Sequence, residues 1–157
     1  MSYSQSFRSG HQEQVDHLLA PVAVLTTCVA LGLDALGVWG DGTPGAEPQT
    51  SQFLAVAGIT VMSAVVVFGL LLPQLIQLRE AGGVALTLGL LALVTVPVFW
   101  LGVSGVLGVA AVLLGIRHRH DERRGSHAKA GATIGALAAV AYVLMYLADW
   151  ANTNSLW

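Results

Sequence analysis

Long uninterrupted apolar runs are the feature that most constrains this chain. Three of them are bounded by polar residues, at Leu18 to Trp39, Phe53 to Leu72 and Ala130 to Ala148. At about 1.5 Å of rise per residue, each run is about long enough as a helix to cross a hydrocarbon core of about 30 Å. The whole chain has 10% charged residues, far below the roughly 25% of a soluble domain. We therefore expect an all-α fold, a polytopic integral membrane helical bundle.

A fourth apolar run, Val84 to Ile116, is too long for a single span. As one helix it would measure roughly 50 Å, well beyond the hydrocarbon thickness. Its middle contains Pro97, Gly102 and Gly105, residues that remove a helix hydrogen bond and allow the backbone to turn. The run therefore predicts a hairpin of two short helices that turns at these residues. One long kinked helix is the alternative, because membrane helices tolerate Pro and Gly.

The distribution of charge and tryptophan favours the hairpin. With five membrane segments, every Lys and Arg falls on one side, which the positive-inside rule makes cytoplasmic: Arg8, Arg79, Arg117, Arg119, Arg123, Arg124 and Lys129. The tryptophans then lie at the opposite face, where indole rings prefer the membrane interface: Trp39, Trp100, Trp150 and Trp157. We expect a multi-pass membrane protein with a cytoplasmic N-terminus and an external C-terminus.

The expected organisation is one transmembrane domain at 18–150, between a cytoplasmic segment at 1–17 and a tail at 151–157. The predicted spans are about 18–39, 53–73, 84–100, 104–118 and 129–149, and the second is expected to be closed by Pro73, Gln74, Gln77, Arg79 and Glu80. The third and fourth spans are short, so a re-entrant hairpin is the alternative to two full crossings. Signal cleavage is not expected, because Glu13 and Asp16 precede an apolar run too long for a signal peptide.

The single cysteine, Cys28, excludes an internal disulfide framework. The sequence from Leu25 to Cys28 resembles a bacterial lipoprotein box, but Thr27 stands where that box requires a smaller residue. We expect Cys28 to be a small thiol buried among helices.

Asp34, near the outer end of the first span, is the candidate intramembrane polar site. An ionisable side chain within a span is costly to bury and is by default a functional candidate. In the alternative interpretation, Asp34 lies close enough to Trp39 to reach interfacial water. Thr60, Ser63 and the segment around Pro97 would join Asp34 in a polar path, and a pairing with Asp149 is geometrically allowed.

Other binding and catalytic signatures are lacking. His118, His120 and His127 suggest a metal site, but adjacent arginines would repel a cation, so we expect no metal ligands and a solvated loop against anionic lipid headgroups. The sequence has no nucleotide-binding or catalytic motif. Its seven Lys and Arg are scattered or confined to one short loop, so the chain has no basic face for nucleic acid either. We expect no cofactor and no enzymatic activity.

Small residues in the last apolar run predict close helix packing. Gly131 and Gly135 form a G-x-x-x-G motif that Ala139 extends, and such a stripe lets two helices approach closely. The stripe serves either packing within the chain or association with a second copy.

The C-terminal half resembles a bacterial membrane domain of unknown function. The resemblance rests on a glycine-spaced apolar hairpin that ends in Leu114-Gly115-Ile116 and Arg119, followed by a basic turn and a helix that opens with Ala130-Gly131 and Gly135. It implies an architecture and no activity. The acidic pair Asp121 and Glu122 and the turn around Pro97 depart from the family's pattern.

Two functions remain from the sequence. The first is a structural or accessory membrane protein that packs against itself or a larger membrane complex. The alternative is a transporter or channel component that uses Asp34 and the broken helix around Pro97.

Overall fold

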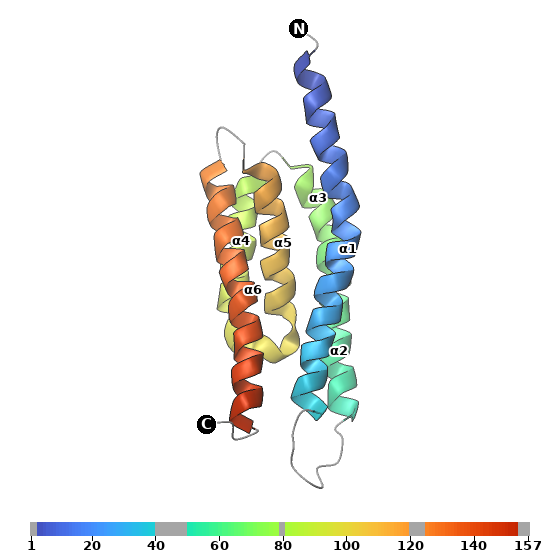
Figure 1. Ribbon diagram of the computed structural model, residues 1–157, viewed down its shortest axis with the longest axis vertical. Helices are drawn as coiled ribbons and strands as arrows, with labels where there is room; N and C mark the ends of the chain where they lie inside the picture. The colour runs from blue at the N-terminus through green and yellow to red at the C-terminus, as the bar shows by residue number, and fades with distance from the viewer. Residues whose placement is uncertain (1–2, 40–49, 79–80, 120–124, 154–157) are drawn as a thin grey trace.

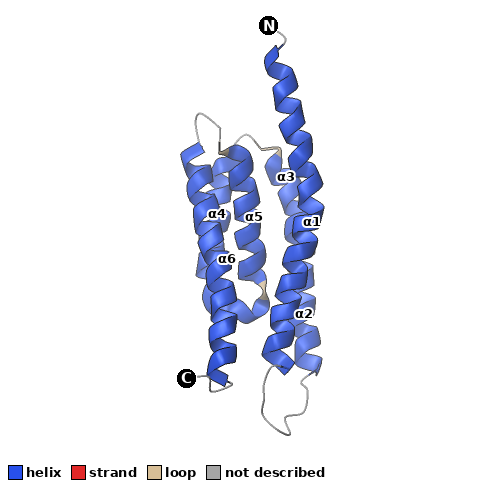
Figure 2. Cartoon of the chain, in the orientation of Figure 1, coloured by secondary structure: helices blue, strands red, loops and turns tan. Residues whose placement is uncertain are grey.

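The computed structural model of the chain describes residues 3–39, 50–78, 81–119 and 125–153, with side chains from residue 18 onward except at 99–100. Within these ranges the chain forms helices joined by turns, with no strand (Figure 2). The elements stand as a bundle of roughly parallel and antiparallel helices (Figure 1). The expected all-α class is confirmed.

Three helical stretches are long and apolar enough to cross a membrane. They are Leu18–Trp39 of α1 (Tyr3–Trp39), Thr50–Ile76, and α6 (Gly125–Thr153). Their lengths of 22, 27 and 29 residues exceed the roughly 20 residues that span a hydrocarbon core. Most of their side chains face outward, as expected when lipid is the solvent. The chain is therefore a membrane-embedded helical protein.

The second of these stretches continues through Pro73 and ends at Ile76, with Gln77 as its C-cap. Gln77 is one of the residues expected to close it, and the prediction is wrong in including Pro73 and Gln74, which lie within the helix. The stretch consists of α2 (Thr50–Ala64), a π-helical segment η1 (Val65–Leu71) and α3 (Leu72–Ile76). In a regular α-helix, the Pro73 ring would clash with the carbonyl four residues earlier. The wider π turns just before Pro73, with the Leu72 N–H donating to the Val67 carbonyl, accommodate the ring and let the helix go on.

The fourth apolar run is a hairpin and not one long helix. α4 (Ala81–Val94) leads into a 3-10 turn η2 (Val96–Leu101), and α5 (Val103–His118) runs back beside α4 (Figure 1). Val98 leaves helical geometry at φ −106° and ψ 40°. Gly102 adopts φ +68°, where a side chain is strained, and an added Cβ would also collide with Thr60. Pro97 and Gly102 thus lie in the turn, and Gly105 lies in the first turn of α5.

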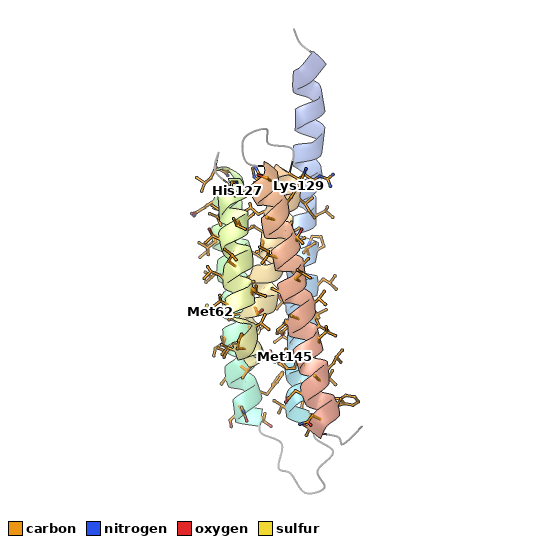
Figure 3. The ribbon with its side chains drawn as sticks, turned by 90° about the vertical axis from the view of Figure 1, so that its left-hand side faces the viewer. Met62, His127, Lys129 and Met145 are labelled. Atoms are coloured by element: carbon orange, nitrogen blue, oxygen red, sulfur yellow. The ribbon has the colours of Figure 1, made fainter. Side chains whose placement is uncertain are left out.

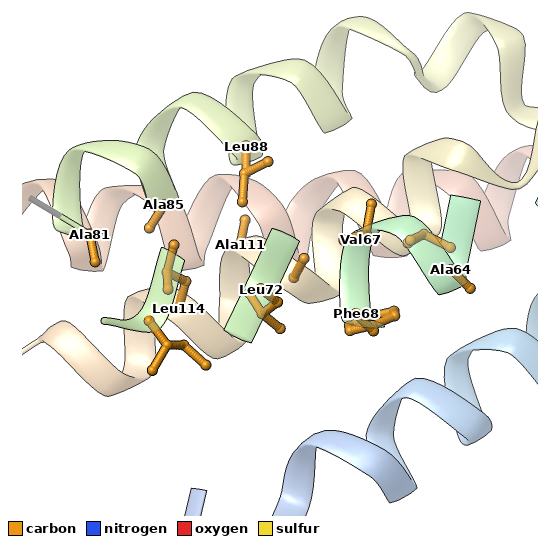
Figure 4. Packing of buried hydrophobic residues seen from close by; sticks show 12 residues of the cluster. Ala64, Val67, Phe68, Leu72, Ala81, Ala85, Leu88, Ala111 and Leu114 are labelled. Carbon is orange, nitrogen blue, oxygen red and sulfur yellow. The ribbon is translucent and has the colours of Figure 1, made fainter. Parts of the chain in front are cut away.

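Residues from both halves of the chain meet in one apolar core. The largest buried cluster joins the second long helix to the hairpin and is shown from close by in Figure 4. Leu72 and Leu114 are its largest fully buried side chains. Around them lie Ala64, Val67, Phe68, Ile76, Ala81, Ala85, Leu88, Val106, Ala110 and Ala111.

The small-residue stripe of α6 packs within the chain. A Cβ placed on Gly135 would lie 2.6 Å from the Gly108 carbonyl oxygen and 2.8 Å from the Ala111 Cβ. A Cβ on Gly131 would collide with the backbone of Ala85. Ala139 contacts the same hairpin at Gly108. Of the two uses left open by the sequence, the structure shows packing of α6 against its own hairpin.

The two ends of the bundle differ in composition. Arg117 and Lys129 lie at the end where α5 stops and α6 starts, and Lys129 is labelled there in Figure 3. Trp39 and Trp150 lie near the opposite end, at the ends of α1 and α6 (Figure 1). Outside what is described lie Arg79, Arg123, Arg124 and Trp157, and the side chains of Arg8 and Trp100.

Cys28 does not lie in the core. Its thiol is free and exposed on the surface of α1, so the prediction of a buried thiol is wrong. The face of α1 that turns inward carries Ala30, Leu33 and Asp34 instead.

Candidate functional site: a buried polar cluster around Asp34

Four side chains from three helices form a buried polar cluster. Asp34 comes from α1, Thr60 from α2, and Tyr142 and Tyr146 from α6, and each is at most 6% exposed. We call these four residues the Asp34 cluster. It lies where the pair of helices α1 and α2 meets the unit formed by α4, α5 and α6 (Figure 1).

Both carboxylate oxygens of Asp34 accept hydrogen bonds from other helices. The Tyr146 hydroxyl donates to Oδ1 at 2.5 Å, and the Thr60 hydroxyl donates to Oδ2 at 3.1 Å. The Thr60 Oγ1 also lies 3.3 Å from the Leu101 carbonyl oxygen. Asp34 therefore links α1 to α2 and α6, and Thr60 connects it to the hairpin turn.

Glycines make room for this arrangement. Tyr142 and Tyr146 are four residues apart and so lie on one face of α6. A Cβ on Gly105 would lie 3.0 Å from the Tyr142 ring, and a Cβ on Gly37 would lie 3.4 Å from the Tyr146 ring. Two aromatic rings can enter the helix interface because the facing helices carry no side chain there.

The Tyr142 hydroxyl is buried and makes no hydrogen bond within the described part of the chain. Its ring packs edge-on against that of Tyr146, with centroids 5.3 Å apart, and the two hydroxyl groups lie near each other without forming a hydrogen bond of good geometry. A buried hydroxyl without a partner costs free energy, and such a group in a native fold calls for an explanation.

The alternative in which Asp34 reaches interfacial water is wrong. Asp34 is 3% exposed, because the face of α1 that carries it is turned toward α6. Asp149, considered as a partner, is exposed at the end of α6, and the residue that contacts Asp34 is Tyr146, almost one turn earlier. The described Arg117, Arg119 and Lys129 belong to the other end of the bundle.

Thr60 is a cluster member that the sequence indicated, whereas both tyrosines were missed. Two hydroxyl-bearing aromatics four residues apart, inside an otherwise apolar span, were the available signal.

Ser63 is half-buried and Pro97 is exposed. The turn contributes the Leu101 carbonyl to the cluster, and Gly102 contacts Thr60. Ser104 instead closes the hairpin, donating to the Ala92 carbonyl at 2.9 Å.

Two of the three candidate histidines lie within the described residues. His118 lies at the end of α5 and His127 in the first turn of α6 (Figure 3), and His120 falls outside the described residues. Among the described residues, no group of three His, Cys, Asp or Glu is placed to hold a metal ion.

Comparison with known proteins found no family model, no curated protein and no solved structure that matches this chain. The resemblance of the C-terminal half to a bacterial membrane domain thus stays an expectation from the residues quoted for it.

Proposed function

We propose that this chain is a structural or accessory membrane protein whose α2 surface packs against a helix of a second copy or of a larger membrane complex. One observation carries the proposal: the glycines of α2 and η1 face outward with nothing packed on them, whereas those of α5 and α6 are filled by the chain itself. A Cβ on Gly58 or Gly69 would meet no atom within 4 Å.

These glycines belong to one exposed stripe along the second long helix. Its members recur at intervals of three and four residues, which keeps them on one face, and all are exposed: Ala55, Gly58, Met62, Val65 and Gly69. Glycine costs a helix interior about 1 kcal/mol relative to alanine. In membranes this cost is offset when a second helix backbone packs closely against the small residues.

Site-specific photo-crosslinking in native membranes tests this proposal. A photoreactive amino acid at Met62, which points away from the bundle in Figure 3, is expected to form an adduct with a protein. Leu137 on α6 is the matched control, because its exposure of 61% is close to the 65% of Met62, and we expect it to label lipid.

The Gly58→Leu variant should abolish the Met62 adduct, because the added side chain separates the two backbones. Ala136→Leu, which adds similar bulk to an exposed position of α6, should leave it intact. Equal protein labelling at Met62 and Leu137, or an adduct that persists in Gly58→Leu, would refute packing through this stripe.

We also propose that the basic end of the bundle faces the cytoplasm and the tryptophan end faces outside. The positive-inside rule and the preference of indole rings for interfaces support the same orientation. The hairpin is consistent with this orientation. Because α5 runs back beside α4, the basic residues that flank the hairpin in the sequence, Arg79 and Arg117, are expected on the same side of the membrane.

Cysteine accessibility tests the orientation. In a Cys28→Ser background, single cysteines at Ser51 and Asn152 should react with an impermeant reagent added to intact cells, and one at Ser126 should react after the membrane is opened. These three positions are exposed near helix ends. Labelling of Ser126 from outside would reverse the proposed orientation.

A second candidate function is a transporter or channel component, and the Asp34 cluster is the observation that favours it. A carboxyl group buried between helices at the tip of a broken hairpin is typical of intramembrane ion and proton sites. An Asp34→Asn variant that is expressed normally but loses a transport phenotype would favour this function over the first. We propose no enzymatic activity, because the sequence has no catalytic signature.

A further inference from the structure

The Asp34 cluster has hydrogen-bonding groups suited to both protonation states of one carboxyl group. In the arrangement observed, Tyr146 and Thr60 both donate to the Asp34 carboxylate. Two donors on one carboxylate stabilise its ionised form. This arrangement leaves the Tyr142 hydroxyl unpartnered.

The neutral form of Asp34 removes that deficiency. A proton on Oδ1 would donate to the Tyr146 oxygen, and the Tyr146 hydrogen would then be free to turn toward Tyr142. The edge-on packing of the two rings keeps the side chains together while the hydroxyl rotates. Thr60 would continue to donate to Oδ2, which is the carbonyl oxygen of the neutral acid.

The ionised form has a cost that the neutral form avoids. Burying a negative charge between membrane helices is unfavourable, and no described basic side chain belongs to the cluster. The hydrogen bonds from Tyr146 and Thr60 favour the ionised form of Asp34, whereas desolvation favours its neutral form. Because the two effects oppose each other, neither form is strongly preferred, and the buried carboxyl group can gain and lose its proton.

We infer that the Asp34 cluster is a reversible proton-binding site, in which the Asp34 carboxyl takes up the proton and the Tyr146 hydroxyl switches its donation from Asp34 to Tyr142. The step is the transfer of one proton from hydronium to a carboxylate oxygen, which leaves water, and no other bond is made or broken.

Among the described residues, the groups near Asp34 are the titratable Tyr142 and Tyr146 from α6 and the hydroxyl of Thr60 from α2. The Leu101 carbonyl of the hairpin turn lies against Thr60. Asp149 lies exposed at the end of α6 and acts on the cluster only at a distance. The proton-dependent change is therefore expected to involve Asp34 and its tyrosines alone.

The Asp34 cluster lies near the tryptophan end of the bundle. Asp34 is five residues from the last residue of α1, about 8 Å along the helix. The hairpin turns back at the level of the cluster, where Leu101 contacts Thr60. Which compartment this end faces rests on the proposed orientation, whereas proton binding itself does not depend on that orientation or on packing through α2.

Infrared difference spectroscopy of the full chain in lipid nanodiscs tests this inference. The carbonyl stretch of a protonated carboxylic acid is recorded as a function of pH, and the spectra of Asp34→Asn are subtracted. We expect an Asp34-specific band that appears as the pH falls. Asp149→Asn is the matched control on a water-exposed carboxyl group and should retain the band.

Tyr142→Phe supplies a second readout. In the neutral form of the cluster, Tyr142 accepts a hydrogen bond from Tyr146, and this variant removes that acceptor. Proton binding by Asp34 should therefore weaken by about fivefold, a typical value for one neutral hydrogen bond. The midpoint of the infrared titration should move to lower pH. The variant leaves Asp34 in place, so it tests the inference even if Asp34→Asn does not fold.

Three results would overturn the inference. An Asp34-specific band that stays constant over the pH range in which the chain remains folded would mean a permanently neutral acid. No such band at any pH would mean a permanent carboxylate. A midpoint that depends on sodium concentration, but not on Tyr142, would make the cluster a metal-cation site instead.

Discussion

Replacing Gly135 with leucine is expected to destabilise the bundle by about 3 kcal/mol, the upper part of the range for overpacked cores. The added side chain would meet the Gly108 carbonyl oxygen, 2.6 Å from the position of its Cβ, and the Ala111 Cβ. A backbone carbonyl cannot move aside as a flexible side chain can, so α6 would have to separate from the hairpin. Unfolding by detergent titration, followed by the loss of helicity, measures the effect.

Ala136→Leu is the matched control for this prediction. It places the same side chain one residue later, on the outward face of α6, where lipid accommodates it. Its stability should stay within about 0.5 kcal/mol of that of the wild-type chain, as for most surface substitutions. Equal stability of the Gly135→Leu and Ala136→Leu variants would show that α6 does not pack on the hairpin as described.

Replacing Asp34 with alanine is expected to cost about 2 kcal/mol, a value typical for buried hydrogen-bonding partners that lose their acceptor. Tyr146 would lose its hydrogen bond to Oδ1 and Thr60 its hydrogen bond to Oδ2. Thr60 can still donate to the Leu101 carbonyl, at 3.3 Å, so Tyr146 should account for most of the loss. The same detergent titration gives the free energy of unfolding.

Asp34→Asn should cost less than Asp34→Ala, because the amide keeps an oxygen for Tyr146 and fills the same volume. A double-mutant cycle with Tyr146→Phe isolates the interaction between the two side chains. If Asp34→Ala and Tyr146→Phe had strictly additive effects, the hydrogen bond between α1 and α6 would contribute nothing to stability.

The sequence was sufficient for those features that depend on local composition. Hydropathy can be evaluated over about 20 residues, so the sequence predicted the three apolar stretches that are long enough to cross a membrane. The hairpin was predicted as well, because Pro97 and Gly102 interrupt a run too long for one crossing, and because one side then holds all the basic residues. Pro73 misled the prediction, because the π-helical segment before it lets the helix continue to Ile76.

The tertiary structure alone decided which face of each helix turns inward. In a soluble helix a polar face marks the outside, but a membrane helix is apolar on every side, so its sequence leaves the rotation about its axis undetermined. That rotation buried Asp34 and exposed Cys28 on the same helix. It also brought Asp34 to Tyr146, 112 residues along the chain, and turned Gly131 and Gly135 toward their own hairpin. Membrane insertion follows from the composition of each segment, whereas the polar cluster exists only because packing fixed the orientation of three helices together.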